Sequence, residues 1–152
     1  MKYYIFLLII LFAGCKSSTN NKDLYKNTRF FDDAEIFFSK YKYEVTGYRS
    51  AGNFIIFQLE IPKENLSIET ITALNAKILD RGWKYNYDKK GYYWSYCKLG
   101  SYDSLGIYYP TQESFSLRNG DYLRNELDPN SIHVWFRKDS SKADYKEYAE
   151  CE

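Results

Sequence analysis

The chain has only one histidine, three cysteines and three prolines among 152 residues, and these scarcities restrict its chemistry. A catalytic zinc ion usually takes three protein ligands, commonly several histidines, which one histidine cannot supply. The sequence also lacks a Gly-x-Ser-x-Gly elbow, a Cys-His arrangement and a glycine-rich phosphate loop. His133 alternates with apolar residues in a short run, so we expect a surface histidine on a strand. We therefore expect no catalytic residue, no metal and no cofactor.

Neither sign of charge is in excess, because the chain has 21 basic and 20 acidic residues. Proteins that hold nucleic acid by its phosphates need a basic surplus, so we expect no nucleic-acid partner. The N-terminal uncharged segment 3–13 is 11 residues long. A membrane-spanning helix requires about 20 apolar residues, so this segment is too short to be a permanent span.

What is present at the N-terminus has the layout of a secretory signal. Lys2 supplies a positive charge, the apolar segment follows, and the chain turns polar from Lys16 onward. A basic end, a short apolar helix and small residues before a cleavage site are typical of signal peptides. We assign residues 1–14 to such a signal.

The expected cleavage site resembles the lipobox of bacterial lipoprotein precursors, in which an aliphatic residue and two small residues precede an obligatory cysteine. Here the sequence is Phe12-Ala13-Gly14-Cys15, with phenylalanine where leucine is usual. The resemblance implies cleavage before Cys15, diacylglycerol on its sulfur and acylation of the new amino group with a fatty acid such as palmitate. Several acyl chains on one residue anchor a protein stably, whereas one chain binds only marginally.

The residue after the cysteine bears on the membrane that would hold the anchor. In lipoproteins of enteric-type Gram-negative bacteria, aspartate at this position retains the protein at the inner membrane, and here the residue is Lys16. The resemblance therefore implies the outer membrane, facing the periplasm or the cell surface, if the organism is Gram-negative.

Cleavage would leave 152 − 14 = 138 residues, which is the length of one ordinary domain. We expect a polar tether at 15–27, a single domain at 28–139 and a charged tail at 140–152. Cys97 and Cys151 remain, and an exported protein lives where disulfides persist. We favour a bridge between them over two free thiols; it would contribute about 3–4 kcal/mol on a chain-entropy argument.

Periodicity and turn residues divide the domain into strands and helices, and the high aromatic content (20%, including 17 tyrosines) suits a β-rich fold. Asp32 or Asp33 is expected to cap a short helix that ends near Lys40, and Ser67 to cap an amphipathic helix that Gly82 ends. The expected strands are 41–48, 54–61, 83–88, 92–99, 105–109 and 132–137. Residues 111–130 read as loop with a helical turn around 122–127.

These elements predict an α+β fold, with an antiparallel sheet of about five or six strands and helices packed on one face. If residues 28–31 form a strand, the order of elements up to residue 88 resembles a ferredoxin-like core. In the expected hairpin 83–99, a four-residue loop pairs Tyr87 with Tyr92, Tyr85 with Trp94 and Trp83 with Tyr96, which puts six aromatic residues on one face. A three-residue loop would mix Lys84 and Asn86 with aromatic residues, so we prefer the first register. We expect Trp83, Tyr85, Trp94 and Tyr96 to fill the packed face.

Aromatic density also suggests a function, because tyrosine and tryptophan are frequent hot-spot residues in interfaces. We name Tyr93, Tyr108, Tyr109 and Trp135 as the candidate binding surface. The leading hypothesis is a membrane-anchored, non-enzymatic binding or accessory domain, either an envelope assembly subunit or an immunity-type protein. Its partner would be an envelope protein or glycan. The alternative is a cell-wall or glycan hydrolase that uses two carboxylates about 5–10 Å apart.

Overall fold

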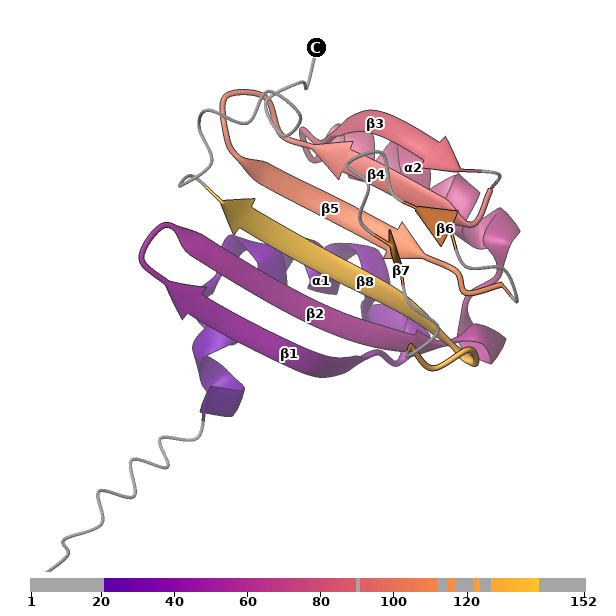
Figure 1. The fold of residues 1–152 in the computed structure, drawn as a ribbon, viewed down its shortest axis with the longest axis horizontal. Helices are drawn as coiled ribbons and strands as arrows, with labels where there is room; N and C mark the ends of the chain where they lie inside the picture. Colours follow the sequence, from indigo (N-terminus) through magenta and orange to yellow (C-terminus); the bar gives the residue numbers. More distant parts are fainter. Residues whose placement is uncertain (1–20, 90, 112–114, 117–121, 124–126, 140–152) are drawn as a thin grey trace, which may run out of the picture.

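The computed structural model of the protein describes residues 21–89, 91–111, 115–116, 122–123 and 127–139. Six antiparallel strands form one sheet in the order β1-β2-β8-β5-β4-β3. Helices α1 (Arg29–Phe38) and α2 (Ile68–Asp80) lie behind this sheet in Figure 1, on one face. The predicted α+β class, with about five or six antiparallel strands and helices on one face, is confirmed. The strands are β1 (Glu44–Ala51), β2 (Phe54–Pro62), β3 (Lys84–Lys89), β4 (Tyr93–Cys97), β5 (Asp103–Tyr108) and β8 (Ser131–Asp139).

Short elements complete the described chain. They are the 3-10 helices η1 (Asn21–Asn27), η2 (Ser39–Tyr41) and η3 (Lys63–Asn65), and a two-stranded sheet of β6 (Phe115–Ser116) and β7 (Tyr122–Leu123). The helical turn predicted around 122–127 is wrong at its start, because Tyr122 and Leu123 pair with β6. The tether predicted to end at residue 27 has a folded last part, since η1 covers its residues from Asn21 onward.

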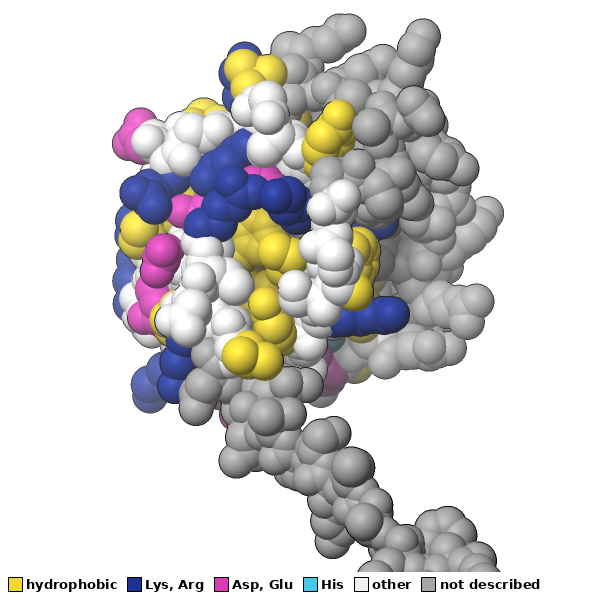
Figure 2. Space-filling view, turned by 90° about the vertical axis from the view of Figure 1, so that its left-hand side faces the viewer, with side chains coloured by type: hydrophobic (Ala, Val, Ile, Leu, Met, Phe, Trp, Pro, Cys, Tyr) yellow, Lys and Arg dark blue, Asp and Glu magenta, His cyan; other side chains and the backbone are white. Residues whose placement is uncertain are grey.

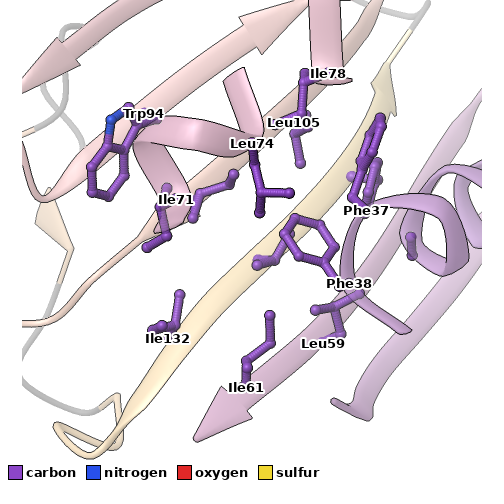
Figure 3. Packing of buried hydrophobic residues seen from close by; sticks show 14 of the residues in the cluster. Phe37, Phe38, Leu59, Ile61, Ile71, Leu74, Ile78, Trp94, Leu105 and Ile132 are labelled. Atoms are coloured by element: carbon purple, nitrogen blue, oxygen red, sulfur yellow. The ribbon is translucent and has the colours of Figure 1, made fainter. Parts of the chain in front are cut away.

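Alternation along the strands separates the two faces of the sheet. On β8, Ile132, Val134 and Phe136 join the hydrophobic core below the helices, and His133 and Trp135 point to the opposite face. Strand β8 lies between β2 and β5, so a strand late in the sequence forms the centre of the sheet. Figure 3 shows how side chains from α1, α2 and the central strands meet in this core. We call the face opposite the helices the outer face.

Helix α1 corrects two predictions. Its cap is Thr28, whose Oγ1 accepts a hydrogen bond from the backbone N–H of Phe31 (3.2 Å), so residues 28–31 are not a strand and Asp32 and Asp33 are not the cap. The ferredoxin-like order therefore fails at its first element. Phe30, Ala34, Phe37 and Phe38 are buried at the spacing of one helical face, which is why tertiary packing favours the helix here.

Helix α2 has the form that its sequence predicts. Ser67 caps it by accepting a hydrogen bond from the backbone N–H of Thr70 (3.3 Å), and Glu69 lies in the first turn. Ile71, Leu74 and Ile78 form the buried face. Gly82 follows with a positive φ of 79°, a conformation that glycine adopts without steric cost.

The β3–β4 hairpin has neither of the two registers considered. Tyr85 lies opposite Tyr96 but Tyr87 lies opposite Ser95, because a bulge falls between Tyr85 and Tyr87. Six aromatics on one face are therefore a wrong prediction, since Tyr92 packs with Tyr93 on the outer face. The expectation that aromatics fill the packed face holds for Trp83, Trp94 and Tyr96, which belong to the core, whereas Tyr85 is exposed.

A buried carboxylate ties both helices to the sheet. Asp33 is only 1% exposed, and its Oδ1 accepts hydrogen bonds from the Arg81 guanidinium (3.1 and 3.2 Å) after α2. Its Oδ2 accepts from the Trp83 indole N–H (2.9 Å) and from Lys98 Nζ (3.1 Å). A carboxylate can be buried at this point because two cations and a neutral donor compensate for its lost hydration.

Candidate functional site

The four aromatic residues predicted as a binding surface do lie together on the outer face. Tyr93 and Tyr108 are directly opposite each other on β4 and β5, and Trp135 and Tyr109 pack against them. The Trp135 ring stacks on the Tyr93 ring with centroids 5.7 Å apart. Tyr93 and Tyr108 are each only 4% exposed, so most of this cluster is interior. The part that a partner could reach is half-buried Trp135 and half-buried Tyr109.

His133 is not the surface residue that the sequence predicts, since only 6% of it is exposed. One ring nitrogen, Nδ1, lies 3.5 Å from Glu60 Oε1, and the other, Nε2, is 3.0 Å from the Asp128 carbonyl oxygen. The ring also stacks on Tyr108. Contacts at both nitrogens explain why a polar ring is buried on this face, and they leave neither nitrogen directed at a substrate.

A cleft of about 380 Å³ lies between η1, α1 and the beginning of β1. This volume falls in the usual range for ligand sites, about 300–1,000 Å³. Apolar rings and a branched side chain form its walls, and charged and hydroxyl groups form its rim. The lining residues are Tyr25, Lys26, Phe31, Glu35, Ser39, Lys42, Tyr43 and Val45.

Packing of η1 on the domain builds one wall of this cleft. The Tyr25 ring stacks on Phe57 with centroids 5.5 Å apart and meets the Phe31 ring at 5.4 Å. Thr28 Oγ1 donates a hydrogen bond to the Tyr25 carbonyl oxygen (2.7 Å), which fixes η1 to the start of α1. The wall is therefore set by contacts within the domain and does not depend on a ligand.

Polar chemistry in the cleft centres on Tyr43, whose hydroxyl donates a hydrogen bond to Glu35 Oε1. Partial burial raises the pKa of Tyr43 above its ordinary value, and the hydrogen bond and negative charge of Glu35 raise the pKa further. The phenol thus stays protonated at neutral pH and holds the carboxylate in one position. Glu35 is the only carboxylate among the residues that line the cleft.

Lys42 gives the rim an unusual backbone. Its φ of 54° and ψ of 55° place it in the left-handed region, and it is the only non-glycine residue with positive φ in the described part of the chain. This conformation costs a non-glycine residue about 1–2 kcal/mol. Strained residues concentrate at binding and switching sites, so the backbone conformation of Lys42 supports the cleft as a functional site.

Sequence reasoning missed this cleft. Tyr25 and Lys26 were assigned to the tether, and Phe31 to a hypothetical strand, so their convergence with β1 was invisible. The available signal was Thr28, a good N-cap residue placed just before an apolar run with helical spacing.

Of the three cysteines, the structure describes only Cys97. Cys97 is buried at the end of β4, opposite Lys84 on β3 and Ser104 on β5. Cys15 and Cys151 lie outside the described residues, so lipidation and the Cys97–Cys151 bridge stay predictions. The tail predicted at 140–152 also lies outside.

Among the described residues, no helix is long and apolar enough to cross a membrane. No three His, Cys, Asp or Glu side chains among them cluster in a way that could hold a metal ion. No family model matches the chain, and no match is found among curated proteins or solved structures.

Proposed function

We propose that this chain is a lipid-anchored protein of the bacterial envelope, whose domain binds a polypeptide partner without catalysing a reaction. The cleft beside β1 is the observation that carries the proposal, because it combines apolar walls with a rim of two lysines and a tyrosine-bound carboxylate. Such a mixture suits a segment with an apolar side chain between charged residues. The partner is an envelope assembly component or a toxin that the protein neutralises.

Strand β1 extends the binding surface beyond the cleft. It is an edge strand of the sheet, so one side of its backbone pairs with β2 and the other has no neighbouring strand within the six-stranded sheet. A bulge between Val45 and Gly47 interrupts this edge, and the regular part follows from Gly47 to Ala51. An extended partner segment can add main-chain hydrogen bonds along such an edge while a side chain enters the cleft.

The anchor rests on the lipobox resemblance, and its test is independent of the cleft. Cys15→Ala should abolish fatty-acid labelling and release the protein from the membrane fraction. The proposed location is the outer membrane, if the organism has one, because Lys16 follows the cysteine. Labelling that persists in the variant would overturn the anchor.

Site-specific photo-crosslinking tests the binding role. A photoreactive amino acid at Ser39, which is exposed and lines the cleft, should give a discrete adduct with one envelope protein in intact cells. The same amino acid at Ala73, which is exposed on α2, is the matched control and should give none. Equal adducts from both positions, or adducts from neither, would contradict the proposal.

Lys42→Gly separates binding from folding. Glycine removes the rim cation and also relieves the left-handed backbone, so this variant should be at least as stable as the parent. We expect it to lose most of the Ser39 adduct, whereas Lys40→Ala, next to the cleft but outside it, should keep the adduct. If Lys42→Gly retains the adduct, the cation at the rim of the cleft does not contribute to binding the partner.

One observation favours the hydrolase alternative. Glu44 and Glu60 are directly opposite each other on β1 and β2, and a directly opposed pair has Cα atoms about 5 Å apart. A retaining glycosidase requires two carboxyl groups about 5–5.5 Å apart, and side chains at directly opposed positions on one face of a sheet can meet that spacing. Glu60→Gln should abolish any wall-degrading activity if this pair is catalytic, and it should leave the Ser39 adduct unchanged.

A further inference from the structure

Cations gather at the end of the molecule that holds the N-terminus of α1, the β4–β5 turn and the last residues of β8. Figure 2 looks onto this end and shows Lys and Arg side chains in a band across it, above hydrophobic side chains. We call this surface the basic end. Its members are Arg29, Arg81, Lys98 and Lys138.

Buried carboxylates hold the basic end in place without cancelling its charge. Asp33 pairs with Arg81 and Lys98, and Asp103, also buried, pairs with Arg29. The Arg29 and Arg81 side chains remain 49% and 45% exposed, so their outward N–H groups stay accessible. Two buried acids thus face four cations, so the side chains that the structure describes leave the basic end positive.

The other charged side chains near this end do not change the sign of its net charge. Asp32 is exposed on α1 and Asp80 on α2, and both lower the potential there. Arg49 near the end of β1 and Lys84 at the start of β3 are exposed cations that offset them. Among the described side chains, six cations thus face four acids, a surplus of about two near one end of a chain whose net charge is only +1.

Apolar side chains project from the same end. Leu99 is 55% exposed and Tyr102 is 37% exposed, and both lie in the β4–β5 turn that begins at Lys98. An exposed leucine and tyrosine beside cations is the composition of surfaces that rest in the headgroup region of a membrane. Lys and Arg can extend to phosphates while such apolar tips enter the boundary with the acyl chains.

The length of the tether gives this surface a definite neighbour, and here the inference rests on the proposed lipid at Cys15. Only six peptide units join Cys15 to Asn21, the first residue of η1. A fully extended chain of that length spans at most about 20 Å. The η1 turn lies at the same end of the molecule as the basic end in Figure 1, so the anchor keeps this surface within reach of the bilayer.

We propose that the basic end binds anionic phospholipid headgroups of the leaflet that carries the anchor. The domain then stands on the membrane through Arg29, Lys138 and the Leu99–Tyr102 turn. Each cation near an anionic surface adds attraction that decays within a Debye length, about 8 Å at physiological ionic strength.

Hydrogen exchange of the lipidated protein tests this orientation. The protein is reconstituted in vesicles of phosphatidylcholine alone and in vesicles that also contain about 30% phosphatidylglycerol. We expect the backbone amides at 99–102 to exchange about fivefold more slowly on the anionic vesicles. The attraction of one cation to such a surface raises the population of the docked state by about that factor, and in the docked state these amides are shielded from water. Salt at about 1 M, where the Debye length is about 3 Å, should remove the difference.

Variants complete the experiment. Leu99→Asn combined with Lys138→Gln should abolish the protection. Ile36→Asn combined with Lys40→Gln changes an exposed pair near the C-terminal end of α1 and in η2, and it should keep the protection. Exchange in β8 reports whether each variant is folded. Equal exchange on both vesicle types, with the protein anchored to each, would overturn the inference. Failure to associate with either vesicle would instead overturn the lipid anchor.

Discussion

Gly106 is the residue at which the outer face tolerates no side chain. A Cβ atom there would lie 2.3–2.5 Å from atoms of the Trp135 indole, which is itself stacked on Tyr93. Gly106→Ala should therefore lower the free energy of unfolding by about 1–3 kcal/mol, the usual cost of overpacking. Urea denaturation followed by tryptophan fluorescence measures this change.

Gly47 provides the matched control in the same cross-strand row. A Cβ atom there would meet Oε1 of exposed Gln58 at 2.5 Å, and the end of that flexible side chain can move away. Gly47→Ala should thus change stability by no more than about 0.5 kcal/mol. If the two variants lose equal stability, the indole contact is not the cause.

Tyr96 makes a second prediction at the residue scale. Its hydroxyl is buried, and it has no hydrogen-bond partner among the described residues. Burial, followed by the nearby Tyr85 and Asp88, raises the pKa of Tyr96 above its ordinary value of 10, and burial and Asp88 raise the pKa of Tyr85 to about 12. Tyr96→Phe should be neutral or stabilising by up to about 1–3 kcal/mol, because it removes an unsatisfied polar group.

The raised pKa values of Tyr96 and Tyr85 also determine how the stability of the fold changes at alkaline pH. A phenol whose pKa is higher in the folded state ionises first in the unfolded chain, so its contribution is complete below pH 10 and is lost as the pH rises from 10 toward 12. Unfolding free energies measured from pH 8 to 12 should fall less steeply in Tyr96→Phe than in the parent. Parallel slopes would mean that Tyr96 does not drive the loss.

At the scale of elements, Thr28 joins η1 to α1. Its hydroxyl accepts from the Phe31 amide and donates to the Tyr25 carbonyl, so one side chain caps the helix and positions a cleft wall. Thr28→Ala should cost about 1 kcal/mol, and Thr28→Ser should retain most of that stability. Thermal unfolding of the two variants checks this, and equal melting temperatures would contradict the capping role.

Elements with a strong local signal could be predicted from the sequence. Helix α2 has a cap, one apolar face and a terminal glycine, and β2 and β8 are continuous apolar or alternating runs. Helix α1 was placed too late because Phe30 and Phe31 favour strands locally, whereas the Thr28 cap and the burial of Phe30 under the sheet favour a helix. Local preference and tertiary packing disagreed there, and packing prevailed.

The register of the β3–β4 hairpin and the location of the cleft could not be predicted from the local sequence, for a different reason. The bulge after Tyr85 shifts one part of the hairpin relative to the other, and no residue pattern marks it. The cleft joins residues from 25 to 45 that meet only when η1 folds back onto α1. Tyr93, Tyr108, Tyr109 and Trp135 were named as a binding surface from aromatic density, which carries no information about the burial of Tyr93 and Tyr108.

At the scale of the whole molecule, the two proposals place different surfaces in different surroundings. The basic end would rest on lipid headgroups through Arg29, Lys138 and the Leu99–Tyr102 turn, whereas the cleft lies between α1 and the edge strand β1. A domain held within about 20 Å of the bilayer meets envelope partners at a fixed height. Such pre-orientation reduces the rotational freedom lost on binding, which favours a modest cleft as an effective site.

The proposed Cys97–Cys151 bridge would join the C-terminal residues to the end of β4 and close a loop of about 54 residues. Cys97 is buried beside Ser104, so Cys97→Ser alone also disturbs packing and cannot by itself demonstrate a bridge. Cys151→Ser should lower the unfolding free energy by about 3–4 kcal/mol. A melting temperature roughly 10 °C lower should accompany that loss.

A double-mutant cycle distinguishes a bridge from two separate thiols. If the cysteines are joined, removing either one breaks the same bond, so the double variant should be little less stable than Cys97→Ser alone. Reduction with dithiothreitol should destabilise the parent and leave both single variants unchanged. Additive losses in the double variant, with no change in electrophoretic mobility on reduction of the parent, would show two independent thiols. In that case the C-terminal residues would have no covalent link to the sheet.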